Sequence, residues 1–257
     1  MSLDGMEPAQ LFSVRFFWFK IDGLIVMISY LLGSIPFGYL VGRARGMDIR
    51  KQGSGNIGAT NVMRLLGKRA GYTVLACDAL KGIIAVIAGK YIADHHSLPV
   101  SQAQTIFEGV DQVIRHTTYI VRLPEAIGAI TAAIVCIIGH NFPVWLGFKG
   151  GKGMATSAGV LIAMMPETAI GCMIVWAIVF LLTRYVSLAS IAAAIALPLI
   201  TMLLLMSGLL HGWPYLYFAI AAGILAVWRH RSNIVRLLNG TENRFVKKPK
   251  VEEPAGT

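Results

Sequence analysis

The chain alternates between long apolar runs and short polar stretches, and this pattern predicts helices that cross a membrane. An apolar run of about 20 residues matches the hydrocarbon core of a bilayer, which is about 30 Å thick. The fourth and fifth predicted runs are short, and the boundary between them falls near Pro166 and Glu167. The seven predicted helices cover 23–43, 71–93, 125–146, 154–168, 169–184, 188–208 and 213–229.

The apolar runs show none of the alternating polarity of membrane β-strands, so we expect an all-α fold. The predicted architecture is an integral membrane bundle of seven transmembrane helices that forms one domain, 23–231. Residues 1–22 are interpreted as an interfacial lead-in, with a start codon further downstream as the alternative. A polar extracytoplasmic loop is predicted at 94–124, and 232–257 are expected to form a cytoplasmic C-terminal segment.

Composition agrees with a membrane protein. The chain is 56% hydrophobic and only 14% charged, whereas a soluble domain carries about a quarter charged residues. Of the 23 Lys and Arg residues, 17 fall in alternate connecting segments and the C-terminal region. The positive-inside rule therefore places the N-terminus outside and the C-terminus in the cytoplasm. The same rule explains the net charge of +10, so we expect no nucleic-acid partner.

Neither the cysteines nor the histidines of the chain predict a metal or a cofactor. Cys77, Cys136 and Cys172 fall in apolar runs without metal or redox spacing, and we interpret them as small packing residues. The histidines of the 94–124 loop are interpreted as ordinary residues of a solvated segment. They are His95, His96 and His116.

The first of four polar clusters is the stretch GSGNIGATNVMR, 53–64. Its glycines free the backbone for close approach to a ligand. A simple turn with a capping side chain is the alternative. The number of donors exceeds what a cap requires, so we favour an anion site, whose candidates are Ser54, Asn56, Thr60, Asn61 and Arg64.

The second cluster is GHNFPVWLGFKGGKGMATS, 139–157. It lacks the first glycine and the Ser or Thr of a P-loop, and no strand precedes it. Its glycines still allow backbone N–H groups to face an anion near the start of a helix. Lys152 adds a charge there, although a lysine that extends to the membrane surface is the alternative. The candidates are Gly150, Gly151, Lys152 and Gly153.

The third and fourth clusters are RYVSLAS, 184–190, and VWRHRSNIVRLLNGTENRF, 227–245. Ser187 is a suitable helix N-cap, and Ser190 faces nearly the same way one turn on. His230 and Asn233 are three apart and share a helix face. A histidine at this boundary titrates near neutrality and donates to phosphate, or it is merely an interface residue.

Structural roles are expected for the remaining polar residues near the membrane. Asp78 and Lys81 are three apart within a predicted helix, and we interpret them as an ion pair that faces the bundle interior, with a secondary role in the site as the alternative. His140 and Asn141 are interpreted as caps of the third helix. Arg229, Arg231 and Arg236 are interpreted as anchors at the membrane interface.

Together these stretches resemble the integral-membrane acyl-phosphate:glycerol-3-phosphate acyltransferase (PlsY) family of bacterial phospholipid synthesis. The matches follow the family's order and span nearly all of 33–242. The chain departs from the family in its N-terminal extension and in the long loop 94–124. The segments that carry the resemblance are GSIPFGYL, GSGNIGATNVMR, DALKG, GHNFPVWLGFKGGKGMAT, RYVSLAS and HRSNIVRLLNGTE.

The resemblance implies transfer of a fatty acyl group from acyl phosphate to the sn-1 hydroxyl of glycerol 3-phosphate. The products are lysophosphatidic acid and phosphate, and no cofactor is used. The enzyme is expected in the bacterial cytoplasmic (inner) membrane, with its active site facing the cytoplasm. Its expected partners are the two substrates, the lipid bilayer and an upstream phosphate acyltransferase that makes acyl phosphate.

The resemblance also assigns roles to the candidate residues. Either His230 or the phosphate of the substrate removes the hydroxyl proton, and either Ser187 or Ser190 lies in the site. The implied catalytic residues are Ser54, Arg64, Lys152, His230 and Asn233. The implied substrate- or phosphate-binding residues are Asn56, Thr60, Asn61, Gly150, Gly151, Gly153, Ser187, Ser190 and Glu242.

Acyl phosphate is already an activated anhydride, so a covalent enzyme intermediate is not needed, and the chain shows no nucleophile-base arrangement for one. The competing class is a transporter of an organic phosphate or another anion. Such a protein needs broken helices at mid-depth and repeat symmetry, neither of which the sequence indicates. Several apolar helix faces compete as the acyl-chain groove, so the pattern does not predict the preferred chain length.

Overall fold

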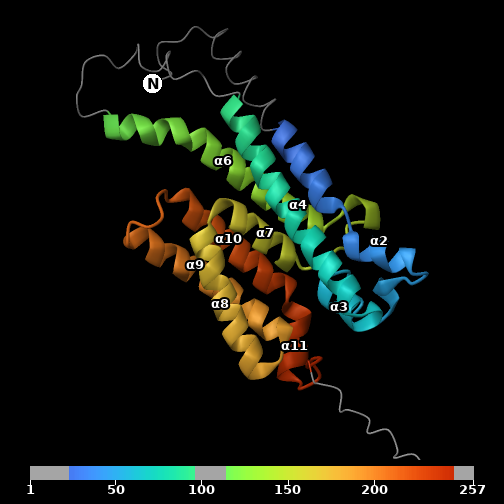
Figure 1. Ribbon diagram of the computed structural model, residues 1–257. Coiled ribbons are helices and arrows are strands. Elements are labelled where there is room, and N and C mark those ends of the chain that lie inside the picture. Colours follow the sequence, from blue (N-terminus) through green and yellow to red (C-terminus); the bar gives the residue numbers. More distant parts are fainter. Residues whose placement is uncertain (1–22, 96–113, 246–257) are drawn as a thin grey trace, which may run out of the picture.

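The computed structural model describes residues 23–95 and 114–245, which form helices and contain no strand. The predicted lead-in 1–22 and the last part of the C-terminal segment, 246–257, lie outside the described residues. The elements after the first span are α2 (Phe37–Ala44), η2 (Ile49–Lys51), α3 (Ala59–Leu66), α4 (Lys68–His95), α6 (Ile114–Asn141), η3 (Val144–Leu146), α7 (Met154–Met164), α8 (Pro166–Thr183), α9 (Val186–Met206), α10 (Pro214–Arg229) and α11 (Arg231–Leu238) (Figure 1).

Seven apolar helices occupy the predicted places in the described part of the chain, and five of them are long enough to cross a bilayer. The shorter two are α7 and α10. The break between the fourth and fifth helices falls at Met165, next to the predicted boundary. The five long spans are Gly23–Ala44, Lys68–His95, Glu125–Leu146, Pro166–Thr183 and Val186–Met206.

Two predicted boundaries differ from the structure. The polar loop predicted at 94–124 is shorter, because α4 continues to His95 and α6 begins at Ile114. The helix α6 includes Pro124, and membrane helices tolerate proline because neighbouring groups satisfy the freed carbonyl. The second helix begins at Lys68 rather than at 71, so Asp78 lies about three turns from its start.

The bundle consists of two groups of helices (Figure 1). In one group α4 packs against α6 and α7, and in the other α9 packs against α8 and α10. Glycines allow the close approach within the first group. A Cβ at Gly82 would collide with the carbonyl of Thr156 in α7, and one at Gly89 would collide with Gly128 of α6. Small residues of this kind let helix backbones approach closely in membranes.

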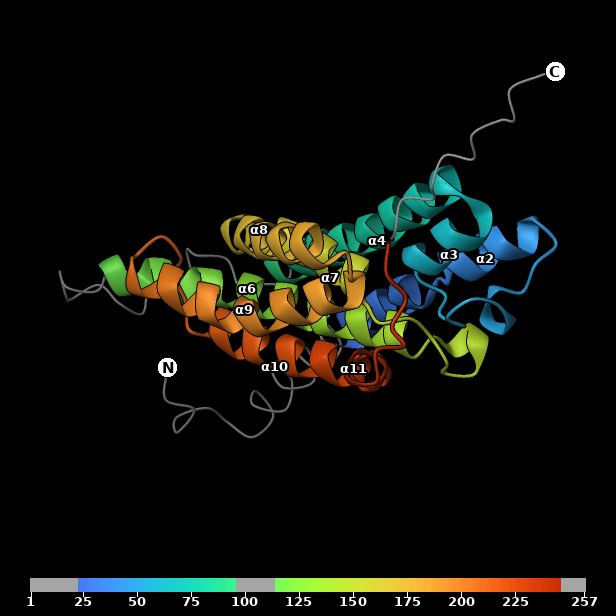
Figure 2. The ribbon, with the colours of Figure 1, turned by 90° about the horizontal axis from the view of Figure 1, so that it is seen from below.

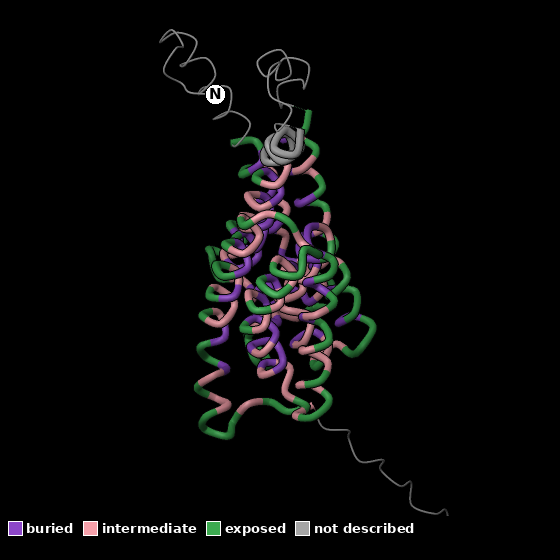
Figure 3. Tube along the Cα trace, turned by 90° about the vertical axis from the view of Figure 1, so that its left-hand side faces the viewer, coloured by how far each residue is buried: buried purple, intermediate pink, exposed green. Residues whose placement is uncertain are grey.

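The largest buried apolar cluster lies where the two groups meet. It includes Val86 of α4, Val160 of α7, Leu197 of α9 and Phe218 of α10. The outer helix faces carry large exposed apolar side chains, such as Leu199 at 67% exposure. Figure 3 shows buried positions inside the bundle and exposed ones on its outer faces. This distribution is typical of a bundle whose outside contacts lipid.

The segments that carry the four polar clusters gather at one end of the bundle. Lys152 contacts Asn233, Arg64 contacts Asn243, and the amide of Phe245 donates to the carbonyl of Arg184. Figure 2 shows α2, α3 and α11 toward this same end. Segments far apart in the sequence therefore form a single polar region.

Candidate active site

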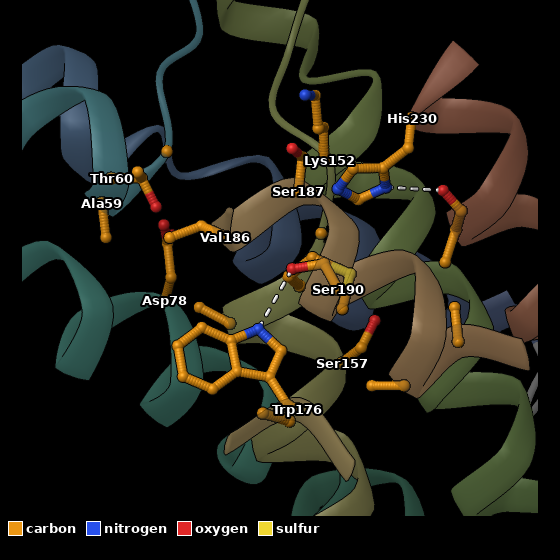
Figure 4. Close-up of a pocket in the computed structure, with 18 of the residues that line it drawn as sticks. Ala59, Thr60, Asp78, Lys152, Ser157, Trp176, Val186, Ser187, Ser190 and His230 are labelled. Carbon is orange, nitrogen blue, oxygen red and sulfur yellow. Dashed lines mark hydrogen bonds between the residues drawn. The ribbon is translucent and has the colours of Figure 1, made fainter. Parts of the chain in front are cut away.

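A cavity of about 430 Å³ opens at the polar end, between the two groups of helices. It brings together all the predicted site residues except Gly150 and Gly151. Figure 4 shows Lys152, Ser187 and His230 gathered at one end of the cavity, with Trp176 and Ser190 further in. The predicted residues that line it are Ser54, Asn56, Thr60, Asn61, Arg64, Lys152, Gly153, Ser187, Ser190, His230, Asn233 and Glu242.

The amino-terminal ends of three helices form part of the cavity wall. These ends are 58–60 of α3, 153–155 of α7 and 186–187 of α9. The first N–H groups of a helix have no partner within the helix, and the helix dipole makes this end positive. Three such ends around one cavity favour anions.

Lys152 supplies a partly buried positive charge. Its Nζ donates a hydrogen bond to Oδ1 of Asn233. Burial, followed by the charge of Arg236, lowers the pKa of Lys152 from 10.5 to about 8, while the carboxylate of Glu242 opposes this shift. The ammonium therefore stays protonated at neutral pH, although it is poorly solvated. A charge in such surroundings interacts strongly with a bound anion.

Glu242 organises the residues around Lys152. Its Oε1 accepts hydrogen bonds from Ser187 Oγ at 2.9 Å and from Asn233 Nδ2 at 2.8 Å, and its Oε2 accepts from Arg236 Nε at 2.8 Å. Burial alone would raise the pKa of this carboxyl, but the hydrogen bonds lower it below the ordinary 4.5. Glu242 is thus an ionised acceptor whose oxygens are occupied by the protein. We assign it to holding Asn233 rather than to binding phosphate.

His230 is a neutral imidazole, which corrects the expectation of a histidine that titrates near neutrality. Its Nδ1 lies 2.8 Å from the carbonyl of Ala226, and this bond requires the proton on Nδ1. Burial lowers its pKa to about 4, and the charge of Lys152 contributes. Nε2 is then an acceptor, so this tautomer does not donate to a phosphate. Nε2 is suited to accept a hydrogen bond from a hydroxyl group instead.

The first polar cluster divides into scaffold residues and residues open to the cavity. The side-chain amide of Asn61 donates to the carbonyls of Ile49, Gln52 and Asn56, and its Oδ1 accepts from the amide of Ser54 at 3.0 Å. Asn56 Oδ1 likewise accepts from the amide of residue 58 at 2.8 Å. These bonds occupy Asn61 almost completely, so its predicted ligand role is better described as support of the loop.

Arg64 lies at the mouth of the cavity. Its Nη2 donates to the carbonyl of Asn243 at 3.2 Å, and its guanidinium lies 4.9 Å from the centre of the Phe245 ring. Burial lowers the pKa of this guanidinium, and the nearby charge of Glu242 opposes the shift. An arginine remains charged under these conditions. The sequence singled out Arg64 but gave no signal for Asn243 or Phe245.

The Gly150–Gly151 turn is built differently from the prediction. The amide of Gly150 donates to the carbonyl of Asn141 at 3.2 Å, and the amide of Gly151 donates to the carbonyl of His140 at 3.1 Å. These two N–H groups are therefore not available to an anion. Arg229 donates to the carbonyls of both glycines, with Nη2 3.2 Å from Gly150 O. Arg229 thus fixes the turn that carries Lys152, a role that the membrane-anchor interpretation missed.

The predicted ion pair of Asp78 and Lys81 is present inside the bundle. Lys81 Nζ lies 2.7 Å from Asp78 Oδ1, and both side chains are 2% exposed. His140 joins them, with its Nδ1 2.9 Å from Lys81 Nζ. Its ring also packs against Gly151, where a Cβ would collide with the imidazole. His140 therefore connects the ion pair to the turn before Lys152 and is more than a helix cap.

The cavity continues as an apolar groove between α7, α8, α9 and α10. Trp176 Nε1 donates to Ser190 Oγ at 3.3 Å where the polar end meets this groove (Figure 4). From His230 to Phe218 the groove follows α10 for about 18 Å, at about 1.5 Å per residue. Its apolar lining includes Leu161, Ala169, Cys172, Leu197, Phe218 and Ala222.

No group of three or more His, Cys, Asp or Glu side chains is placed to hold a metal in 23–95 and 114–245. The three cysteines are free, and Cys136 and Cys172 are buried, in line with the packing role expected for them. His95 is part of α4, and its ring lies against that of Tyr91 in a tilted arrangement with 3.8 Å between ring centroids.

A positive polar pocket that continues into an apolar groove inside a helical membrane bundle is typical of a protein that handles an anionic amphiphile. The glycerol-3-phosphate acyltransferase family model matches residues 23–240. The chain therefore belongs to the glycerol-3-phosphate acyltransferase family, whose members are acyltransferases of phospholipid biosynthesis.

Individual relatives cover nearly the whole chain. The glycerol-3-phosphate acyltransferase of Thermosynechococcus vestitus is 40% identical over 224 residues, which are 87% of this chain and 94% of the relative. That of a Nostoc species is 41% identical over 233 residues, 90% of this chain and 95% of the relative. These values extend the likeness beyond the motifs to nearly the whole chain.

Crystal structures of PlsY, an integral membrane glycerol 3-phosphate acyltransferase, share the fold. Its glycerol 3-phosphate form has a TM-score of 0.67 and 39% identity, covering 88% of this chain and 96% of that one. Its lysophosphatidic acid form has a TM-score of 0.66 and 38% identity, covering 88% and 95%. The all-α fold and the family suggested by the motifs are thus confirmed.

Proposed function

We propose that the protein transfers a fatty acyl group from acyl phosphate to the sn-1 hydroxyl of glycerol 3-phosphate, producing lysophosphatidic acid and phosphate. One observation carries the proposal. Three helix amino termini, Lys152 and Arg64 surround the polar end of a cavity whose other end is apolar. Such a cavity suits two phosphorylated substrates, one of which brings a hydrocarbon chain.

The two phosphates use different parts of the polar end. Lys152 and the first amides of α7 hold the phosphate of acyl phosphate, which is the leaving group. Arg64, Ser54 and the first turn of α3 hold the phosphate of glycerol 3-phosphate. A guanidinium and free helix N–H groups suit phosphate oxygens. The acyl chain occupies the apolar groove, so the reacting carbonyl lies between the two phosphate positions.

His230 positions the acceptor. Its Nε2 accepts a hydrogen bond from the sn-1 hydroxyl, because Nδ1 donates to Ala226. With a pKa of about 4, this imidazole is a poor general base at neutral pH. The proton therefore passes to a phosphate oxygen of the substrate. The hydroxyl oxygen bonds to the acyl carbon, the bond from that carbon to the phosphate oxygen breaks, and phosphate leaves beside Lys152.

Asn233 links the charges of the site. Its Oδ1 accepts from Lys152 and its Nδ2 donates to Glu242. Glu242 also holds Ser187, which makes Ser187 the serine nearer the reacting end, while Ser190 lies further in beside Trp176. Preorganised groups of this kind stabilise charge that develops during the reaction.

The membrane arrangement extends the same proposal. All seven apolar helices span the bilayer of a bacterial cytoplasmic membrane, with the N-terminus outside and the site facing the cytoplasm. The two short helices, α7 and α10, span the bilayer together with the polar turns that flank them. Acyl phosphate is a product of a phosphate acyltransferase reaction, so an enzyme of that class supplies the donor.

The test uses the purified protein in detergent micelles, which have no sealed compartment. Phosphate release that requires both acyl phosphate and glycerol 3-phosphate supports the proposal and excludes anion transport as the primary activity. Lys152→Ala and His230→Ala should each lower turnover by about 10²-fold or more. Transfer from acyl coenzyme A but not from acyl phosphate would show that the proposed donor is wrong. No transfer from either donor would refute the activity.

A further inference from the structure

One residue, Phe218, borders both the apolar groove and a second cavity. The second cavity, of about 260 Å³, lies between α6 and the start of α10. Phe218 lines both cavities and is itself only 2% exposed. The other residues of the second cavity are Ile127, Ile130, Thr131, Ile134, Pro214 and Tyr217. It is thus almost wholly apolar, and it adjoins the groove at Phe218.

The residues that α10 presents to the groove are spaced by four. Phe218, Ala222, Ala226 and His230 all line it, and residues four apart lie on one helix face. The two alanines leave room for a chain along the helix, whereas the phenyl ring fills the same space at the far end. This face therefore runs from the hydroxyl-binding imidazole to a bulky wall.

The length of this face matches the length of the acyl chain of an ordinary membrane lipid. It measures about 18 Å by helix rise, which is slightly more than half of a hydrocarbon core about 30 Å thick. One leaflet of acyl chains occupies half of that core. A chain of ordinary membrane length therefore ends at Phe218, and a longer one meets the ring.

We propose that Phe218 is the residue that sets the maximal acyl-chain length, by closing the groove in front of the second cavity. This inference rests on the proposed function, in that the groove holds the transferred chain. Loss of the ring joins the two cavities and admits longer chains. A large residue at Ala222 closes the groove earlier, about 12 Å from His230 by helix rise, and restricts it to shorter chains.

The experiment measures the dissociation constants of lysophosphatidic acids of increasing chain length by thermal stabilisation of the purified protein in detergent. Three variants are each compared with the wild type: Phe218→Ala, Phe218→Leu and Ala222→Phe. Ile220→Ala is the matched control, because Ile220 lies on the same helix, is 41% exposed and lines neither cavity. Product binding does not depend on the acyl donor, so this assay reads the groove separately from the reaction.

Phe218→Ala should raise the affinity ratio of behenoyl over palmitoyl lysophosphatidic acid by about tenfold or more, since methylene groups in a fitted pocket discriminate on this scale. Ala222→Phe should lower the ratio of palmitoyl over lauroyl by a similar factor, and Ile220→Ala should leave both ratios unchanged. Phe218→Leu serves if the alanine variant does not fold, with a smaller shift in the same direction. Unchanged ratios in the folded variants at both positions would overturn the inference.

The same variants are then assayed with acyl phosphates of matching chain length. A shift in product binding without any turnover of acyl phosphate would leave the role of Phe218 supported and would show that the proposed donor is wrong. Turnover of acyl phosphate with no shift in chain-length preference would support the proposed function and overturn the role of Phe218.

Discussion

Replacement of Lys152 by methionine should change stability and activity in opposite directions. Methionine keeps the length of the side chain and removes its charge. Burial is the largest cause of the low pKa of Lys152, which falls from 10.5 to about 8. At about 1.4 kcal/mol for each tenfold change in the protonation equilibrium, this shift corresponds to about 3 kcal/mol. Keeping the charged ammonium therefore costs the folded protein up to about 3 kcal/mol.

The pH dependence follows from the direction of the shift. The folded protein holds the Lys152 proton less tightly than the unfolded chain does. The cost is therefore complete below about pH 8 and disappears as the pH rises toward the unfolded pKa of 10.5. Lys152→Met should be more stable than the wild type at neutral pH, although loss of the hydrogen bond to Asn233 offsets part of the gain. The difference should shrink at alkaline pH.

The assay combines thermal unfolding in detergent across this pH range with the turnover of acyl phosphate and glycerol 3-phosphate. Turnover should fall by about 10²-fold or more, because one preorganised charge at the leaving phosphate is lost. Glycerol 3-phosphate should still stabilise the variant through Arg64. A variant that is less stable than the wild type by an amount independent of pH would refute the reasoning on burial. Near-normal turnover would refute the catalytic role.

Three further predictions concern the same pocket. The kcat/KM of the wild type should fall above about pH 8 as Lys152 loses its proton. Lys152→Arg should move this fall to higher pH. An unshifted profile would show that a group other than Lys152 causes the fall. Glu242→Gln should lower kcat by about tenfold or more through loss of charge-assisted hydrogen bonds, and equal losses in the exposed control Glu167→Gln would contradict the role of Glu242. Arg229→Gln should release the Gly150 and Gly151 carbonyls and lower kcat with little change in the KM for glycerol 3-phosphate. It should also raise the pH above which kcat/KM falls, because the charge of Arg229 lowers the pKa of Lys152. The exposed Arg231→Gln should do none of this, and a higher KM alone in Arg229→Gln would exclude positioning of the turn.

The helices could be predicted because the apolar runs report directly on burial in lipid. The break at Met165 was predicted from Pro166 and Glu167, which are polar or helix-ending residues inside an apolar region. The start of α6 was missed. A helix that continues through Pro124 has the same local composition as a polar loop followed by a proline-started helix, so only tertiary packing distinguishes the two.

The membership of the site could be predicted better than the roles of its members. Asn61 and Gly151 belong to the motifs, but their bonding groups are directed at the backbone of their own loops. A motif shows that a residue type is required and does not show which atom it contacts. Glu242 is a similar case, since its carboxylate holds Asn233 and Ser187 in place of a ligand.

Residues that act through distant partners were missed. Arg229 reaches carbonyls on a segment 78 and 79 positions away, and no local pattern indicates such a contact. His140 likewise meets Lys81 across 59 positions. Phe218 did leave a signal, because Ala222, Ala226 and His230 follow it at intervals of four. That spacing describes a narrow helix face with space beside it, which becomes meaningful once α10 is known to border the cavity.

The central claim is that one pocket holds both phosphorylated substrates at once. The most direct measurement is a structure of the protein with glycerol 3-phosphate and a non-hydrolysable acyl phosphonate bound together. The account predicts one phosphorus atom beside Lys152 and the other beside Arg64, with the acyl chain along α10 as far as Phe218. Mutually exclusive binding of the two ligands, or a phosphate held outside this cavity, would contradict it.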